Sequence, residues 1–416
     1  MILDADKHET EDFWSKARQE VSIDQNIINL NSGSCGPCLK NVHTKLTSLR
    51  SSMASRPIQY LWDDCLVGIE KSRSALAEFF NCNPNNLLML PNVTTACAIV
   101  INSLNLPKGS EVLVSNQEYH HILHHINMVA ASRGWLVKQF HIPTPIEAAD
   151  FTEDDLMQII DQNSNLNTKV IFASHVTSET GCKLPITKIC EWATKNNVLS
   201  IIDGAHAPGA TEIDFEKIRP DYYFANFHKW FLGAIGSGFL FVGEQHKKTL
   251  RPLFANKFWP LIEKNRDRLI NHKIMPNGPT HLQYGLEYSG VVDRGPQAVV
   301  HHAVGFRLEF GDLKLRNRQL KLRDFAECEM QKLGFKTLSH SVVSLKSNLI
   351  SFKIPHVSSY NLLKFLREAH HLEVQVTETT HNYSVLRVAP AFFNTEAEIL
   401  HAAKILAKVD WKLFEK

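Results

Sequence analysis

No run of about 18 apolar residues, the length that a membrane-spanning helix needs, occurs in this 416-residue chain. Residues 1–12 are acidic and lack the apolar stretch of a secretory signal. Lysine and arginine are scattered, and the formal net charge is only +2, so no strong field indicates a nucleic-acid or membrane partner. These absences predict a soluble, cytoplasmic protein.

The sequence also lacks the patterns of a disulfide scaffold or a metal site. Its eight cysteines are dispersed, and Cys35-Gly-Pro-Cys38 has neither a second pair nor a thioredoxin-like context. The histidines at 120, 121, 124 and 125 include the i, i+4 spacing of metal ligands, but nothing indicates a third ligand or a second shell. We therefore expect incidental cysteines and no metal.

What the chain does contain, from about residue 40 to 245, is an alternation of strand-like and helix-like segments. Short apolar or β-branched runs occupy 87–90, 111–115, 170–174, 198–203, 222–225 and 238–242. Segments with helical spacing lie between them. This rhythm is typical of an α/β protein with a mostly parallel central sheet and helices on both faces.

Beyond this region the pattern changes. Residues 246–280 are basic and rich in proline, which predicts a surface excursion. A long charged helix is expected at about 296–333, followed by short strands near 347–354, 372–376 and 384–388. Thr395-x-x-Glu398 is a capping box that opens a last amphipathic helix. We predict an N-terminal segment (1–26), a large domain (27–295) and a smaller C-terminal α+β domain (296–416).

Unusual polar residues fall where the expected strands end, which is where open α/β sheets bind ligands. Thr94 and Thr95 open an apolar helix, so they could hold a phosphate, although Thr94 could also simply cap that helix. Tyr119 follows the next strand and could stack on a flat cofactor. The stretch 174–181 is polar at six of eight positions, which suits either a pocket wall or a solvated loop.

Three charged residues carry the sharper signal. Asp203 ends a buried strand before a Gly-rich turn, and its partner could be a pyridinium N–H or the next turn. Lys229 lies between His228 and Trp230 at a strand end, where burial would lower its pKa and make it a nucleophile. Arg387 stands within an apolar strand and needs a carboxylate, either of a substrate or of the protein.

Together these residues resemble the class V aminotransferase family of fold-type I enzymes, which use pyridoxal 5′-phosphate (PLP). Within the family, the sequence is most similar to the isopenicillin N epimerase-like group. The resemblance spans roughly residues 27–395 and rests on four motifs in order, with Arg387 after them. These motifs are Ile28-Asn-Leu-Asn31-Ser-Gly-Ser-Cys-Gly36-Pro37, Ser174-His-Val-Thr-Ser-Glu-Thr-Gly181, Asp203-Gly-Ala-His-Ala-Pro-Gly209 and His228-Lys229-Trp230.

The resemblance implies a role for each site residue. Lys229 would hold PLP as a Schiff base and move the proton at the substrate Cα, while Asp203 would keep the pyridine nitrogen protonated so that the ring stays an electron sink. Tyr119 would stack on the ring face opposite Lys229. The remaining roles are the ring O3′ edge for His206 and Ser178, the phosphate for Thr94, Thr95, Asn226 and His228, and the substrate carboxylate for Arg387. Asn31 is also expected to bind the substrate.

Two departures from the family pattern bear on assembly and reaction. The stretch Glu287–Asp293 resembles the segment that reaches the neighbouring subunit's phosphate, which implies a homodimer, but Val291 replaces the usual threonine. Residues 375–384 lack the nucleophilic cysteine of cysteine desulfurases. Racemisation, β-elimination, transamination and decarboxylation all remain open, with an epimerase of an amino-acid substrate first and a C–S lyase second. A non-enzymatic PLP-fold module and a metallohydrolase are the competing readings.

Overall fold

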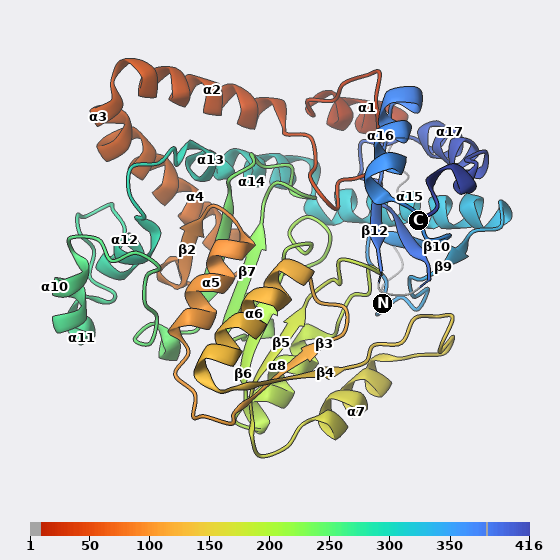
Figure 1. Ribbon diagram of the computed structural model, residues 1–416. Helices are drawn as coiled ribbons and strands as arrows, with labels where there is room; N and C mark the ends of the chain where they lie inside the picture. Colours follow the sequence, from red (N-terminus) through yellow and green to blue (C-terminus); the bar gives the residue numbers. More distant parts are fainter. Residues whose placement is uncertain (1–9, 380–381) are drawn as a thin grey trace, which may run out of the picture.

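The computed structural model describes residues 10–379 and 382–416 (Figure 1). Its central sheet has seven strands in the order β2–β8–β7–β6–β5–β3–β4. Neighbours pair in parallel from β7 to β4, whereas β8 is antiparallel to both β2 and β7. The strands are β2 (Leu87–Leu90), β3 (Glu111–Ser115), β4 (Leu136–Phe140), β5 (Thr168–Ser174), β6 (Leu199–Asp203), β7 (Tyr222–Asn226) and β8 (Gly238–Val242).

Both faces of this sheet are apolar. In β2, Leu87 and Met89 join one buried cluster while Leu88 and Leu90 join the other, as the two-residue period of a strand requires. The helices α5 (Val93–Ser103) and α6 (His120–Arg133) cover one face and lie in front of the sheet in Figure 1. The other face carries α2 (Lys40–Ser55), α4 (Cys65–Phe79), α7 (Glu153–Asn163), α8 (Ile186–Lys195) and α14 (Val300–Phe310). The predicted fold class is confirmed.

The C-terminal part forms a second, antiparallel sheet in the order β12–β13–β10–β9. Its strands are β9 (Lys336–Thr337), β10 (Ile350–Ile354), β12 (Gln375–Glu378) and β13 (Ser384–Val388). The helices α15 (Asp312–Lys332), α16 (Ser359–His370) and α17 (Glu396–Ala407) share its apolar cluster. The smaller C-terminal α+β unit is thus present, and the exact domain boundaries stay predictions.

Two elements near the start of the described chain, α1 (Glu11–Gln19) and β1 (Ile28–Asn29), contact this C-terminal unit. Strand β1 pairs in parallel with β11 (Leu372–Glu373). Arg18 of α1 forms a 2.7 Å ion pair with Glu398. The expectation that residues 1–12 hold no secretory signal falls mostly on 1–9, which lie outside the described residues. In the described part of the chain, no helix is long and apolar enough to cross a membrane.

The helix expected at 296–333 is wrong as a single element. It is divided into α13 (Gly295–Ala298), α14 and α15. Gly311 interrupts the last two with a φ of +81°, a left-handed value that glycine adopts without steric cost. At this break Asp312 accepts hydrogen bonds from Arg307 and Arg316. The charged helical pattern therefore continues across the turn at Gly311, where Asp312 pairs with an arginine on each side.

Other local predictions fared differently. The capping box is confirmed, since the Thr395 hydroxyl accepts from the Glu398 N–H and the Glu398 carboxylate accepts from the Thr395 N–H. The stretch 246–280 is more than a surface excursion, because Trp259 and Ile262 are buried in the central core.

The short elements are α3 (Pro57–Gln59), η1 (Tyr60–Asp64), η2 (Pro84–Asn86), α9 (Phe215–Ile218), η3 (Glu244–His246), α10 (Trp259–Lys264), α11 (Arg266–Leu269), α12 (His281–Glu287) and η4 (Trp411–Phe414).

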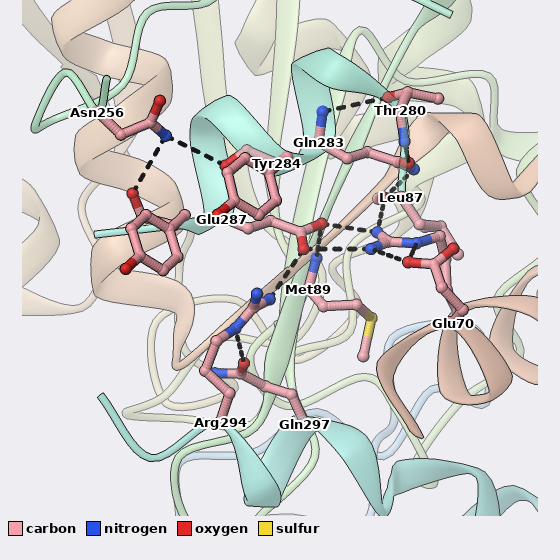
Figure 2. Close-up of polar contacts among 12 residues, drawn as sticks. Glu70, Leu87, Met89, Asn256, Thr280, Gln283, Tyr284, Glu287, Arg294 and Gln297 are labelled. Atoms are coloured by element: carbon pink, nitrogen blue, oxygen red, sulfur yellow. Dashed lines mark hydrogen bonds and ion pairs between the residues drawn. The ribbon is translucent and has the colours of Figure 1, made fainter. Parts of the chain in front are cut away.

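The free edge of β2 is covered by side chains (Figure 2). The buried Glu287 carboxylate accepts from the Met89 N–H at 2.9 Å and pairs with Arg73 at 2.7 Å and Arg294 at 2.9 Å. Gln283 and Arg73 donate to the Leu87 carbonyl. These side chains satisfy backbone groups that an edge strand would otherwise expose, and they join β2 to the chain that leads into α13.

Candidate active site

A cavity of about 520 Å³ opens where β3, β5, β6 and β7 end. It lies at the carboxyl edge of the parallel strands, the position that α/β sheets use for ligands. Residues from the C-terminal sheet close its other side. The predicted residues that line it are Thr94, Tyr119, Ser178, Asp203, His206, Asn226, His228, Lys229 and Arg387, whereas Asn31 and Thr95 do not line it.

Lys229 follows β7 and faces the cavity. Its Nζ lies 3.0 Å from Nε2 of His206. Burial and the Arg387 charge lower the pKa of Lys229 to about 7, although Asp203 opposes them. Burial, and next the Lys229 charge, hold the pKa of His206 well below its usual value, so His206 is a neutral imidazole. The arrangement presents an amine of which a substantial fraction is neutral and nucleophilic near neutral pH.

Asp203 ends β6 and is 3% exposed. Its Oδ1 accepts from the Ala205 N–H at 2.8 Å, so the turn takes one oxygen. Across the described residues no hydrogen bond reaches Oδ2. Burial raises the pKa of Asp203 to about 6, and the Ala205 N–H and Lys229 lower it only in part. A buried residue whose carboxylate has one oxygen free of hydrogen bonds fits a cationic N–H donor such as a protonated pyridine.

Arg387 of β13 brings the C-terminal sheet into the cavity. It is 7% exposed, and it donates to the Ser178 carbonyl at 2.8 Å and to the Ser34 hydroxyl at 2.5 Å. No carboxylate within the described chain pairs with it, so a structural ion pair does not account for its burial. Burial lowers the pKa of Arg387 to about 10, despite an opposing effect of Tyr119. A buried guanidinium without a counter-ion fits the carboxylate of a ligand.

The N-terminus of α5 forms the opposite end of the cavity. Asn92 caps the helix, accepting from the Thr95 N–H at 2.9 Å, so Thr94 is not the cap. The Asn226 side chain accepts from the Val93 N–H at 3.0 Å and fixes the helix to β7. Thr94 lines the cavity between these two capped N–H groups. A helix N-terminus with a hydroxyl at a cavity wall fits a phosphate.

His228 and Tyr119 complete the predicted set. Burial, with the Lys229 charge, lowers the pKa of His228 to about 4, so His228 is a neutral hydrogen-bonding group. Tyr119 is 44% exposed and lies at the cavity rim, with its ring 5.0 Å from that of His121. The buried Asn31 carboxamide oxygen has no partner among the described residues. Asn31 pairs with Ala389 by a bridge, two positions beyond Arg387.

The structure describes the cysteines and histidines for which the sequence predicted neither a thiol function nor a metal site. Cys35 and Cys38 are free, half-buried thiols, and burial raises the pKa of both. In the part of the chain that the structure describes, no group of three or more His, Cys, Asp or Glu side chains could hold a metal ion. His125, one of the four histidines at 120–125, contacts the side chain of Asn102 at 3.3 Å through its Nε2.

Sequence reasoning gave no role to several residues that line the cavity, among them Ser34, Glu118 and Gln375. Ser34 holds Arg387, and Gln375 is the register partner of Arg387 on β12. Glu118 directly precedes Tyr119 and is 4% exposed. The sequence signal for Glu118 was an acidic residue just after an apolar strand, but a solvent-exposed turn begins with the same pattern.

Comparison with known proteins places these features in context. The family Aminotransferase class-V matches residues 38–256. Isopenicillin N epimerase of Amycolatopsis lactamdurans is 30% identical over 95% of this chain and 98% of its own, and that of Streptomyces clavuligerus is 29% identical over 94% and 97%. A solved structure of a C-DES mutant with glycine covalently linked to its PLP cofactor has a TM-score of 0.78 and 22% identity, covering 94% of this chain and 99% of that one.

Proposed function

Because the chain belongs to the class V aminotransferase family of PLP-dependent enzymes, as its motifs predicted, we propose that it epimerises an amino-acid substrate at Cα. The observation that carries the proposal is the meeting of Lys229, Asp203 and Arg387 in one cavity. The match over nearly the whole length of an isopenicillin N epimerase favours epimerisation among the reactions of the family.

The residues present fit PLP. Asp203 Oδ2 is free for the ring nitrogen, and Thr94 at the N-terminal end of α5 lines the cavity where the phosphate would lie. Asn226 and His228 would support the phosphate, and His206 and Ser178 would lie at the ring O3′. When bound, PLP withdraws electron density from the substrate Cα and makes its proton acidic.

The protein's own groups would then bind the substrate, remove one proton from Cα and deliver another to it. Arg387, held in place by Ser178 and Ser34, would bind the substrate carboxylate in a bidentate manner. Lys229 would remove the Cα proton on one face, since its pKa near 7 suits a general base. Tyr119 at the rim would return a proton on the opposite face, which inverts the configuration.

The second candidate is a C–S lyase. A relative described as an L-cysteine desulfhydrase-like protein, from Epichloe uncinata, is 24% identical over 71% of this chain and 64% of its own. Tyr119 could donate a proton to a sulfur leaving group as readily as to Cα. The stretch 375–384 has no cysteine, and β12 instead contributes Gln375 and Thr377 to the cavity, which disfavours a persulfide-forming desulfurase.

We further propose a cytoplasmic homodimer that acts on a small amino-acid substrate and has no nucleic-acid or membrane partner. The segment Glu287–Asp293 supports the dimer. Its first residue, Glu287, is held by the buried ion pairs with Arg73 and Arg294 (Figure 2), and its last, Asp293, forms an ion pair with Arg50 at 2.8 Å. Between these anchors Val291 and Val292 are 72% and 48% exposed, which suits a contact with a second copy. Sedimentation of the holoenzyme should give twice the 47.2 kDa chain mass.

Product analysis in D₂O tests the reaction. The holoenzyme would be supplied with a panel of L-amino acids and cysteine conjugates. An epimerase yields the D-isomer with deuterium at Cα, whereas a lyase releases a keto acid, ammonia and a thiol. Lys229→Ala is the inactive control. Formation of an α-keto acid with retention of the amino group on the cofactor would instead identify an aminotransferase.

A further inference from the structure

Glu118 is a buried carboxyl in the cavity wall to which the roles above assign no function. Ser115 Oγ donates to its Oε1 at 2.5 Å. Ser174 donates twice, from its N–H to Oε1 at 3.2 Å and from its Oγ to Oε2 at 2.5 Å. Because Ser115 ends β3 and Ser174 ends the adjacent β5, Glu118 bridges the carboxyl ends of two neighbouring strands.

This bridge lies next to Asp203. Ser174 is the register partner of Asp203 on β6, and neighbouring strands are about 4.8 Å apart. The next residue, His175, donates its N–H to the Asp203 carbonyl at 2.7 Å. Glu118 and Asp203 thus line the same cavity, with Ser174 between them. Strands β5 and β6 hold the two carboxyl groups at a fixed spacing.

Glu118 has no counter-ion. None of the described lysine, arginine or histidine side chains forms an ion pair with it. The titratable groups that face it from the elements packed against it are Asp203 on β6 and the Cys97 thiol on α5. Its three hydrogen bonds all come from neutral donors of serine residues. A carboxyl in this setting is not explained as half of a structural salt bridge.

We propose that Glu118 supports Asp203 electrostatically: its negative charge adds to that of Asp203 in favouring the protonated form of the cofactor, and uptake of a proton by Glu118 weakens that effect. The proposal rests on the PLP function proposed above. A second carboxylate is felt strongly here because the cavity wall is buried and of low dielectric constant. Glu118 would thereby adjust the electron demand that Asp203 maintains.

The charge of Glu118 is poised to change near neutral pH. Burial raises the pKa of Glu118 to about 7, with a smaller contribution from Asp203, while the serine hydrogen bonds lower it. An anionic Glu118 should raise the pKa of any cation held beside Asp203. Removing the charge should therefore lower the pH at which the bound cofactor loses its proton.

The test is a pH titration of the visible absorption band of the holoenzyme reconstituted with PLP. Glu118→Gln removes the charge at nearly constant shape: its Oε1 can still accept from Ser115 Oγ and the Ser174 N–H, and the Ser174 hydroxyl can rotate to accept from the amide. We expect the midpoint to fall by about 0.5–1 pH unit, the effect of one charge at a distance of several ångströms in a partly polar interior. The matched control is Glu111→Gln at the opposite end of β3, which should leave the midpoint in place. A Glu118→Gln midpoint equal to that of the wild type would overturn the proposal.

A second variant covers the case in which Glu118→Gln fails to fold. Ser174→Ala removes one hydrogen bond to the carboxylate, which raises the pKa of Glu118 and leaves it less negative at a given pH. The midpoint should then fall in the same direction by a smaller amount, and an unchanged or higher midpoint would overturn the proposal. If the wild-type protein acquires no visible band with PLP, the proposed function itself is refuted. A band whose midpoint ignores Glu118 refutes only this inference.

Discussion

The Nζ of Lys229 lies 3.0 Å from Nε2 of His206, and burial suppresses the positive charge of both groups. Because His206 stays neutral, it can accept a hydrogen bond from the lysine without adding a like charge to the cavity. The lysine is thus held toward the cavity in a form that is ready to react. The hydrogen-bonded pair explains how a lysine can be buried in this cavity, where Asp203 is the acidic side chain that acts on it.

This relationship predicts the pH dependence of cofactor uptake. Because the pKa of Lys229 is lowered to about 7, its amine is neutral above that pH and protonated below it. The rate at which the apoenzyme takes up PLP should therefore rise through about pH 7 and level off above it. Stopped-flow absorbance would record this rate. An uptake rate that continues to rise up to about pH 10, the ordinary range of lysine, would contradict the lowered pKa.

Replacement of Lys229 gives the most direct prediction. Lys229→Ala should abolish turnover and the visible band while the fold persists, because the cavity wall loses only one side chain. Lys183 offers a matched control, since burial also lowers the pKa of that lysine but it does not line the cavity. Lys183→Ala should retain both activity and band. Circular dichroism would verify the fold, and activity in Lys229→Ala would contradict the assignment.

Asp203→Asn should slow the reaction by ~10²-fold or more while leaving some PLP bound. The amide can still accept from the Ala205 N–H, so the turn keeps its hydrogen bond. What is lost is the negative charge that stabilises a protonated ring nitrogen. Steady-state kinetics and equilibrium dialysis with PLP would separate the two effects. Wild-type rates in this variant would mean that the cofactor lies elsewhere.

Arg387→Lys should raise KM by about 10- to 100-fold with a smaller effect on kcat. Lysine keeps the charge but lacks the planar fork that binds a carboxylate through two hydrogen bonds. It would also lose at least one of the contacts to Ser178 and Ser34 that fix the guanidinium. Ser34→Ala, which removes one of these contacts, should raise KM by less. Equal KM values for Arg387→Lys and the wild type would exclude Arg387 as the carboxylate site.

The central sheet and the location of the cavity were predictable because both follow from local sequence patterns. Runs that are apolar on both faces mark buried parallel strands, and polar residues at their ends mark a ligand site. Strand β4 was missed since it is an edge strand: Leu136 is 58% exposed, and the run has no uninterrupted apolar stretch. The break at Gly311 was missed because the charged helical pattern continues on both sides of it.

The parts of the site that escaped prediction depend on register between distant segments. Glu118 is recognisable as a buried carboxyl only once Ser115 and Ser174 are known to lie side by side. Ser34 acquires its role from Arg387, which is 353 positions away in the chain. Asn31 was assigned by resemblance and Thr95 from its place at the start of an apolar helix; neither lines the cavity, and their roles stay predictions.

The last prediction concerns stability and uses the buried cluster of Figure 2. Burial raises the pKa of Glu287, but Arg73 and Arg294 outweigh it and hold the pKa below its usual value. A carboxylate with a depressed pKa stabilises the fold above its unfolded pKa, and that contribution is lost as the pH falls through the folded value. Glu287→Gln leaves Arg294 without its ion-pair partner and Arg73 with Glu70 alone, so the free energy of unfolding should fall by about 3–5 kcal/mol.

Urea denaturation at neutral pH would measure this loss. The matched control is Glu263→Gln, which removes an exposed partner of Arg251 and should cost less than about 1 kcal/mol. Glu287→Gln should also show a weaker loss of stability on acidification than the wild type, because the group that titrates is gone. If the variant were as stable as the control, the cluster would contribute little to the edge of β2. A dimer that dissociates more readily in Glu287→Gln would further tie this cluster to the exposed Val291–Val292 segment that it anchors.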